Sequence, residues 1–166
     1  MQRSKVEDIL MPGYVDRWTN GYFNLWNTAV YLAAQEGMLR IASADDRGQV
    51  QLSLAGSLSA EEDQLRGFLD GDAGEIFAAA SLESQFLADG RDSNTCTRIR
   101  YVLGPRSCPD EAILECVEFT FDESCCFFVT PEWDGLVTGS HGSYEHWVDY
   151  LRSDTMDQRQ EKVWRP

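Results

Sequence analysis

The stretch Ile113–Thr138 constrains the fold most, because it combines a period-two apolar pattern with the highest apolar density in the chain. Val117, Phe119 and Phe121 recur at every second position, as in a strand with a buried face. Glu115 is the one polar residue that interrupts this face. The pattern predicts a largely buried β-strand.

Two turns divide this stretch into an antiparallel meander. Asp122–Ser124 forms a short polar turn, after which Cys125–Thr130 is predicted to return as a second strand. Pro131 lacks an amide hydrogen and Asp134–Gly135 is a turn signal. We therefore expect the ladder to break there before Leu136–Thr138 resumes the pairing.

The N-terminal half shows helical periodicity instead. Between Asn20 and Glu36 the apolar residues recur at helical spacing, and Gly37 is placed to end a helix. An alternative is a hairpin in which Val15–Thr19 pairs with Tyr22–Trp26 across an Asn-Gly turn. The helix is preferred because its pattern is longer.

Capping boxes, glycines and apolar spacing define the other elements. We predict a short helix or turn that ends at Pro12-Gly13, helices from Ser59 to Gly71, from Asp72 to Asp89 and from Ser143 onward, and strands Met38–Ser43, Gln49–Leu54 and Thr95–Leu103. In the last strand, Arg98 and Arg100 are expected to face Glu115 or Glu118 across the ladder.

These elements predict an α+β fold within a single domain that spans residues 1–166. An antiparallel β-meander at about residues 95–138 would pack against helices from the N-terminal half and a C-terminal helix. A chain of this length buries a core without disulfides or metals.

The charge of the chain is its most unusual property. There are 28 acidic and 14 basic residues, which gives a formal net charge of −14. The segment 107–151 contains no Lys or Arg but ten acidic residues. This segment is either a solvated surface that keeps the protein soluble or a docking face for a basic partner.

The cysteines indicate reduced thiols. The chain has five of them, and Cys125 and Cys126 are adjacent on a predicted strand, so their side chains face opposite sides. No C-x-x-C pair is present. We therefore predict neither a disulfide framework nor a metal site, and no cofactor.

No apolar run is long enough to span a membrane, and the first residues do not resemble a secretion signal. We therefore expect a cytoplasmic protein that does not bind membranes. The sequence leaves its oligomeric state open.

Catalytic motifs are sparse. The two histidines lie in the segment His141–His146, whose spacing matches neither H-E-x-x-H nor its inverted form. The sequence contains no G-x-G-x-x-G, P-loop or G-x-S-x-G motif. A small hydrolase-like enzyme that uses this histidine segment, with Cys125 or Cys126 as its partner, is retained as an alternative function.

The segment Glu36–Gly56 resembles the wing of MarR-type winged-helix regulators, in which a helix end is followed by a two-stranded wing with a D-x-R element. The resemblance implies a DNA-binding regulator with its recognition helix near residues 22–35. That segment has no basic residue to contact phosphate, so we do not expect nucleic-acid binding.

In size, charge and an acidic hairpin over Glu111–Val137, the chain resembles the small acidic bacterial immunity proteins that neutralise a cognate toxin, often a basic nuclease. The resemblance implies a non-enzymatic inhibitor whose acidic face competes with phosphate for a basic cleft. The expected partner-binding residues are Glu118, Asp122, Glu123, Glu132, Trp133 and Asp134. In this set Trp133 is the aromatic anchor and the carboxylates supply the charge.

Overall fold

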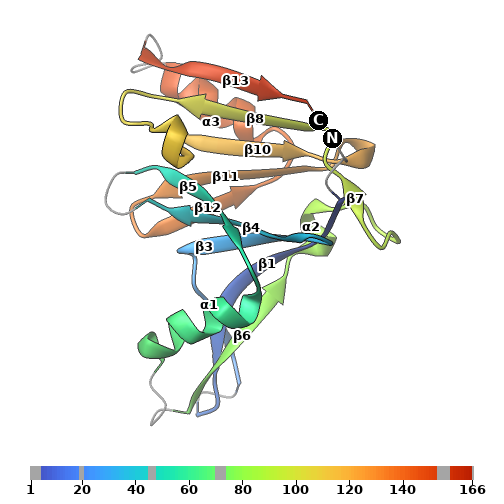
Figure 1. Cartoon of the computed structure of the whole chain (residues 1–166), viewed down its shortest axis with the longest axis vertical. Helices are drawn as coiled ribbons and strands as arrows, with labels where there is room; N and C mark the ends of the chain where they lie inside the picture. Colours follow the sequence, from blue (N-terminus) through green and yellow to red (C-terminus); the bar gives the residue numbers. More distant parts are fainter. Residues whose placement is uncertain (1–4, 19–20, 45–47, 70–73, 153–157, 166) are drawn as a thin grey trace.

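The computed structural model describes residues 5–18, 21–44, 48–69, 74–152 and 158–165. In this part of the chain, thirteen strands form two antiparallel sheets, and three short α-helices pack around them (Figure 1). The molecule is therefore mostly β. The predicted α+β fold with a helix-covered meander is wrong, because most of the expected N-terminal helices are strands.

The first sheet contains eight strands in the order β2-β1-β3-β4-β5-β9, with β6 and β7 also paired to β1. Its strands are β1 (Lys5–Asp16), β2 (Phe23–Leu25), β3 (Ala29–Ala34), β4 (Gly37–Ser43), β5 (Val50–Ala55), β6 (Glu75–Ser81), β7 (Asn94–Thr95) and β9 (Ile113–Leu114). Strand β1 organises this sheet, since it pairs with four other strands along its length.

The short helix or turn that was predicted to end at Pro12-Gly13 is part of β1, and this dipeptide lies inside the strand. The carbonyl of Pro12 accepts a hydrogen bond from the Trp26 amide at 2.8 Å, where the partner of β1 changes from β3 to β2. The missing amide hydrogen therefore costs no ladder bond. A Cβ on Gly13 would overlap the Asn24 carbonyl oxygen and lie 2.7 Å from the Phe23 ring, so glycine permits this close approach.

The helix expected between Asn20 and Glu36 is also wrong, because its described part forms β2 and β3. Both faces of β3 are buried. Val30 and Leu32 face the main core between the sheets, while Ala29 and Tyr31 belong to a second apolar cluster on the other face of the first sheet. A strand buried on both faces is apolar throughout, which mimics helical spacing. The alternative prediction, a hairpin of Val15–Thr19 with Tyr22–Trp26, is closer to the structure than the helix is, because β1 pairs with β2.

The helix expected from Asp72 onward is wrong for a similar reason. Asp72 itself lies outside the described residues, and β6 follows, paired along its whole length with β1. Within the described part of this predicted helix, residues 74–89, only the four residues of α2 (Glu83–Phe86) are helical. Pairing with β1 thus outweighs the local helical pattern.

The MarR resemblance does not extend to the fold. The segment that would be the recognition helix forms β2 and β3, and β4 pairs on one side with β3 and on the other with β5. The predicted hairpin of β4 and β5 is present, but it lies inside a sheet instead of projecting as a wing.

The second sheet confirms the predicted meander. Its strands are β8 (Arg98–Leu103), β10 (Cys116–Thr120), β11 (Cys126–Glu132), β12 (Gly135–Gly139) and β13 (Gln160–Trp164), in the order β12-β11-β10-β8-β13. The ladder does not break at Pro131, which pairs with Leu136. Strand β10 pairs with β11 only as far as Val129. Pro131 therefore has no ladder partner on the side of β11 that faces β10.

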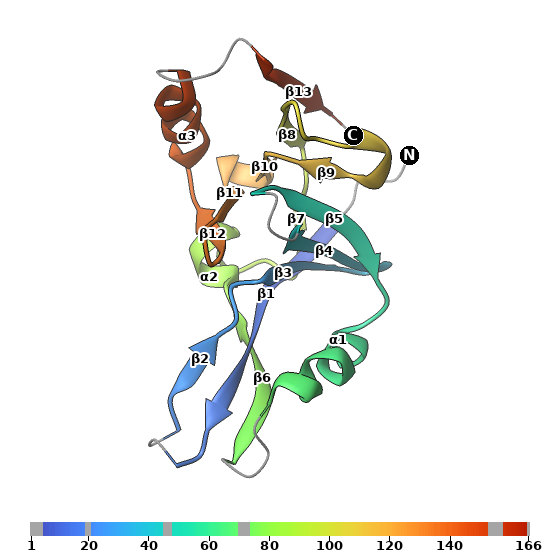
Figure 2. The same ribbon diagram turned by 90° about the vertical axis from the view of Figure 1, so that its left-hand side faces the viewer.

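The two sheets pack face to face, and the main core lies between them (Figure 2). Ile9 and Ile41 from the first sheet and Phe119 and Phe127 from the second are all at most 2% exposed. Phe86 of α2 closes one end of this layer, with its ring 4.9 Å from that of Phe127. Burial of these side chains contributes about 2 kcal/mol each.

The predicted interruption at Glu115 marks the place where the chain changes sheets. Strand β9 before it pairs with β5, and β10 after it pairs with β8 and β11. Glu115 is buried and forms an ion pair with Arg159. A Cβ on Gly104 would overlap the Glu115 carboxylate, so glycine leaves room for this pair.

The helices cover the outer faces. The predicted helices α1 (Leu58–Leu65) and α3 (Ser143–Arg152) are present. Leu58 packs against the outer side of the first sheet, and Tyr144 and Val148 pack against Phe128 on the outer side of the second. The described residues also form three short 3-10 helices, η2 (Arg66–Phe68), η3 (Pro109–Glu111) and η4 (Asp122–Ser124).

The turn between β10 and β11 holds two non-glycine residues in the left-handed region. Glu123 and Ser124 have φ of 57° and 64°, and the Cys125 amide donates to the Asp122 carbonyl at 3.2 Å. This is a type I′-like hairpin turn, for which Asn-Gly is the preferred sequence. Its sequence here is Glu-Ser, so the turn is strained.

Ser124→Gly should therefore raise the free energy of unfolding by about 0.5–1 kcal/mol, because glycine reaches this φ without a Cβ clash. Urea denaturation measures the change. Ser140→Gly is the control, since Ser140 is exposed and has no positive φ. A destabilised Ser124→Gly variant would show that the turn is not strained.

Candidate functional site

The tip of the β11–β12 hairpin is the most exposed aromatic feature of the described surface. Trp133 has a relative exposure of 103%, so its whole indole is in solvent. Glu132 and Asp134 on either side are exposed as well. Among the described residues, no ion pair involves either carboxylate. A large apolar side chain held in water between two free charges is typical of a binding surface.

Contacts with the first sheet fix the position of this tip. The Leu136 amide donates a hydrogen bond of 2.6 Å to the carbonyl of Asn27, in the segment between β2 and β3. Gly135 has φ of +146°, and a Cβ there would lie 2.5 Å from the Asn27 side chain. The hairpin tip is therefore clamped against the neighbouring sheet, and Trp133 projects from a rigid base.

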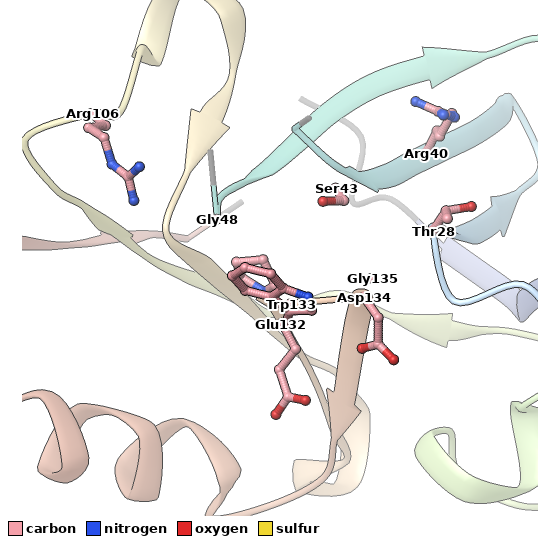
Figure 3. A pocket seen from close by; sticks show the side chains of 10 residues that line it. Thr28, Arg40, Ser43, Gly48, Arg106, Glu132, Trp133, Asp134 and Gly135 are labelled. Atoms are coloured by element: carbon pink, nitrogen blue, oxygen red, sulfur yellow. The ribbon is translucent and has the colours of Figure 1, made fainter. Parts of the chain in front are cut away.

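A pocket of about 980 Å³ opens beside the tip (Figure 3). One side is residues 131–135, and the opposite side comes from the first sheet and the loop after β8. The residues on that opposite side are Thr28, Arg40, Ser43, Gly48 and Arg106. Among the described residues that line the pocket, the acidic ones are therefore on one side and the two arginines on the other.

The two arginines are placed differently in this pocket. In Figure 3 the Arg106 guanidinium is directed into the space beside the Trp133 indole, whereas Arg40 lies at the far end. Arg106 is exposed, and it comes within 3.7 Å of the position that a Cβ on Gly48 would occupy. Arg106 is therefore the cation that an object docked on Trp133 meets first.

The structure brings together only three of the six predicted partner-binding residues. Glu132, Trp133 and Asp134 share the hairpin tip. Asp122 and Glu123 lie at the other end of β11, in η4. A single small docking face therefore does not include both pairs of carboxylates.

Asp122 and Glu123 also have partners within the molecule. Arg91 forms ion pairs with both carboxylates. In addition, Asp122 accepts a hydrogen bond of 2.7 Å from the Thr95 amide. These residues therefore stabilise the β10–β11 turn against the β7 segment.

Glu118 is not on the surface, since it is only 1% exposed. It accepts hydrogen bonds of 2.8 and 2.9 Å from Arg100, and Arg98 lies 3.4 Å away. The predicted pairing of these arginines with Glu118 is thus confirmed, but the carboxylate is buried and is not available to a partner.

Arg100 connects this carboxylate to α3. It donates a 2.6 Å hydrogen bond to Glu145, and its guanidinium lies 3.9 Å from the centre of the Tyr144 ring. Burial alone would lower the pKa of Arg100, but hydrogen bonds to Glu145 and the charge of Glu118 raise it above its usual value. The Tyr144 hydroxyl donates to Glu161 of β13 at 2.7 Å.

Glu118→Ala should lower the free energy of unfolding by about 3 kcal/mol, because it leaves a buried guanidinium with one carboxylate fewer. Glu132→Ala is the matched control and should change it by less than about 0.5 kcal/mol, as expected for an exposed side chain. Chemical denaturation of both variants measures the difference. Equal small effects would mean that the Glu118 pair contributes nothing net.

The alternative histidine site has little geometric support. His141 and His146 are exposed, and within the described residues neither imidazole forms a hydrogen bond to a cysteine. All five cysteines are free thiols. Burial raises the pKa of Cys126, and that of Cys96 to about 11, so these thiols stay protonated near neutral pH.

The described residues contain no group of three or more His, Cys, Asp or Glu side chains arranged to hold a metal ion. No helix in the described ranges has the length and apolar character needed to cross a membrane.

Comparison with protein-family models, with curated proteins and with solved structures finds no significant match to this chain. The fold and the surface described above therefore carry the functional argument alone.

Sequence reasoning missed Asn27, Arg106 and Ser43 as parts of this region. They lie in separate segments that only the packing of the two sheets brings to the hairpin tip. No local pattern marks them. Gly135 was identified as a turn residue, but its contact with Asn27 has no signal in the sequence.

Gly135→Ala should destabilise the fold by at least about 3 kcal/mol, because it adds a backbone clash to the strain of a positive φ. Gly142→Ala is the control: Gly142 also has a positive φ of +87°, but a Cβ there meets nothing within 4 Å. It should cost only about 1–2 kcal/mol. Urea denaturation compares the two, and equal losses would disprove the clamp at Asn27.

Proposed function

We propose that this chain is an inhibitory protein-binding module of the immunity type, which docks on a basic partner through the tip Glu132–Asp134 and neutralises it. The proposal places the protein in the cytoplasm, where reduced cysteines are expected. The five free thiols support this placement.

The full exposure of Trp133 is the observation that carries the proposal. Tryptophan is the residue most enriched among those that dominate interface energies, and it acts best when it enters a pocket on the partner from a rigid base. The Gly135 and Leu136 contacts with Asn27 supply such a base. Little ordering entropy would then be lost on binding.

The charge of the protein supports a basic partner. A formal net charge of −14 attracts cationic proteins at a distance and raises their association rate. The free carboxylates of Glu132 and Asp134 would pair with the partner's cations at the edge of the interface. A basic cleft that normally binds phosphate would be blocked by this tip.

Trp133→Ala tests the anchor. Where the adjacent gene encodes a basic protein, that protein is the partner to test, and the variant should bind it at least about 30-fold more weakly, mainly through faster dissociation. Biolayer interferometry measures both rates. The proposal fails if the wild-type chain does not bind this protein, or if Trp133→Ala binds with unchanged kinetics.

Charge reversal at the tip tests the electrostatic part. Glu132→Lys with Asp134→Lys should slow association and flatten its dependence on salt, since steering acts mainly on the association rate. Asp89→Lys with Asp92→Lys makes the same change of charge on exposed residues of the α2–β7 segment. Similar slowing by both pairs would show that net charge, and not the tip, directs the encounter.

A further inference from the structure

Arg106 differs from most of the described arginines of the second sheet and its margins. Four of them are engaged: Arg91 with Asp122 and Glu123, Arg98 and Arg100 with Glu118, and Arg159 with Glu115. Within the described residues, Arg106 forms no ion pair. Acidic residues outnumber basic ones in the chain, yet no carboxylate of the described residues forms an ion pair with Arg106.

The position of Arg106 makes this lack of a partner informative. Its guanidinium is directed into the open pocket beside Trp133, and the Ser43 side chain lines the same space (Figure 3). An exposed guanidinium that faces a pocket offers a planar donor set suited to a carboxylate. Glu132 and Asp134 line the opposite side of the same pocket.

We propose that the partner docked on this tip inserts a carboxylate into the pocket, where Arg106 binds it with help from the Ser43 hydroxyl. The proposal rests on the function proposed above and specifies the partner further: its docking segment is cationic where it meets Glu132 and Asp134 and carries one carboxylate beside the Trp133 site. The charges of the pocket favour such a mixed segment, because a segment with only basic residues would be repelled by Arg106.

The carboxylate has two possible sources, an acidic side chain and a free C-terminus, and three synthetic peptides distinguish them. The first is acetyl-Lys-Gly-Glu-Gly-Lys-amide. The second replaces Glu with Gln and has no carboxylate. The third is the Gln peptide with a free C-terminus. Each is titrated into the full chain, and the indole N–H signal of Trp133, assigned by its loss in Trp133→Phe, reports binding by NMR.

The two peptides with a carboxylate should bind about two- to fivefold more tightly than the Gln amide peptide, which is the effect of one exposed ion pair. General attraction to an acidic protein predicts the opposite order, because the carboxylate reduces the positive charge of the peptide. A preference for only one of the two carboxylate peptides identifies the source of the group.

Arg106→Gln should remove this preference while leaving the binding of the Gln amide peptide at least as tight. Arg17→Gln is the matched control. It makes the same change of charge at an exposed residue that directly follows β1 and does not line the pocket. The preference should persist in that variant.

The outcomes separate the two proposals. If all three peptides shift the Trp133 signal equally, or if the preference survives Arg106→Gln, the carboxylate site is wrong and the docking tip stands. If no peptide shifts the Trp133 signal in the wild-type chain, the tip does not bind basic segments and both proposals fail.

Discussion

The buried ion pair between Arg100 and Glu118 is the constraint on which the outer half of the structure depends. A carboxylate that is 1% exposed is stable only when its hydrogen bonds are satisfied, and two arginines of β8 do this. Arg100 must in turn be covered, and Tyr144 and Glu145 of α3 cover it. Tyr144 then holds β13 through Glu161. One buried charge thus fixes the place of a helix and an edge strand.

The same pairing changes the meaning of the acidic composition. The segment 107–151 has no basic residue of its own, but arginines from distant parts of the sequence neutralise much of its charge. Glu115 and Glu118 are internal, and Asp122 and Glu123 share Arg91. The hairpin tip keeps its charge because no described arginine forms an ion pair with Glu132 or Asp134. The net charge is therefore a poor guide to where a partner docks, and the unpaired carboxylates are a better one.

The sequence predicted β8, β10, β11 and β12 of the second sheet and the β4–β5 hairpin of the first. It missed β13 in the second sheet and β1, β3 and β6 in the first. Strands β10 and β11 are also buried on both faces, but polar turn residues at 122–124 and 134–135 mark where they end. Strand β3 is apolar on both faces, and its spacing fits a helix. Strand β1 contains Pro12-Gly13, which signals a stop unless the change of partner at that point is known. Such long-range pairing has no local signature in the sequence. The predictions that were wrong concern elements whose structure depends on strands far away in the sequence.

The candidate site illustrates the same division. Trp133 and its flanking carboxylates could be found from the turn signal at Gly135, but the clamp at Asn27 and the cation at Arg106 could not. These two additions matter for binding. An exposed tryptophan on a free hairpin would lose conformational entropy when it docks, and a tip held by the neighbouring sheet has lost most of it on folding. The packing of one sheet on the other therefore does more than bury a core, because it also prepares the tip for a partner.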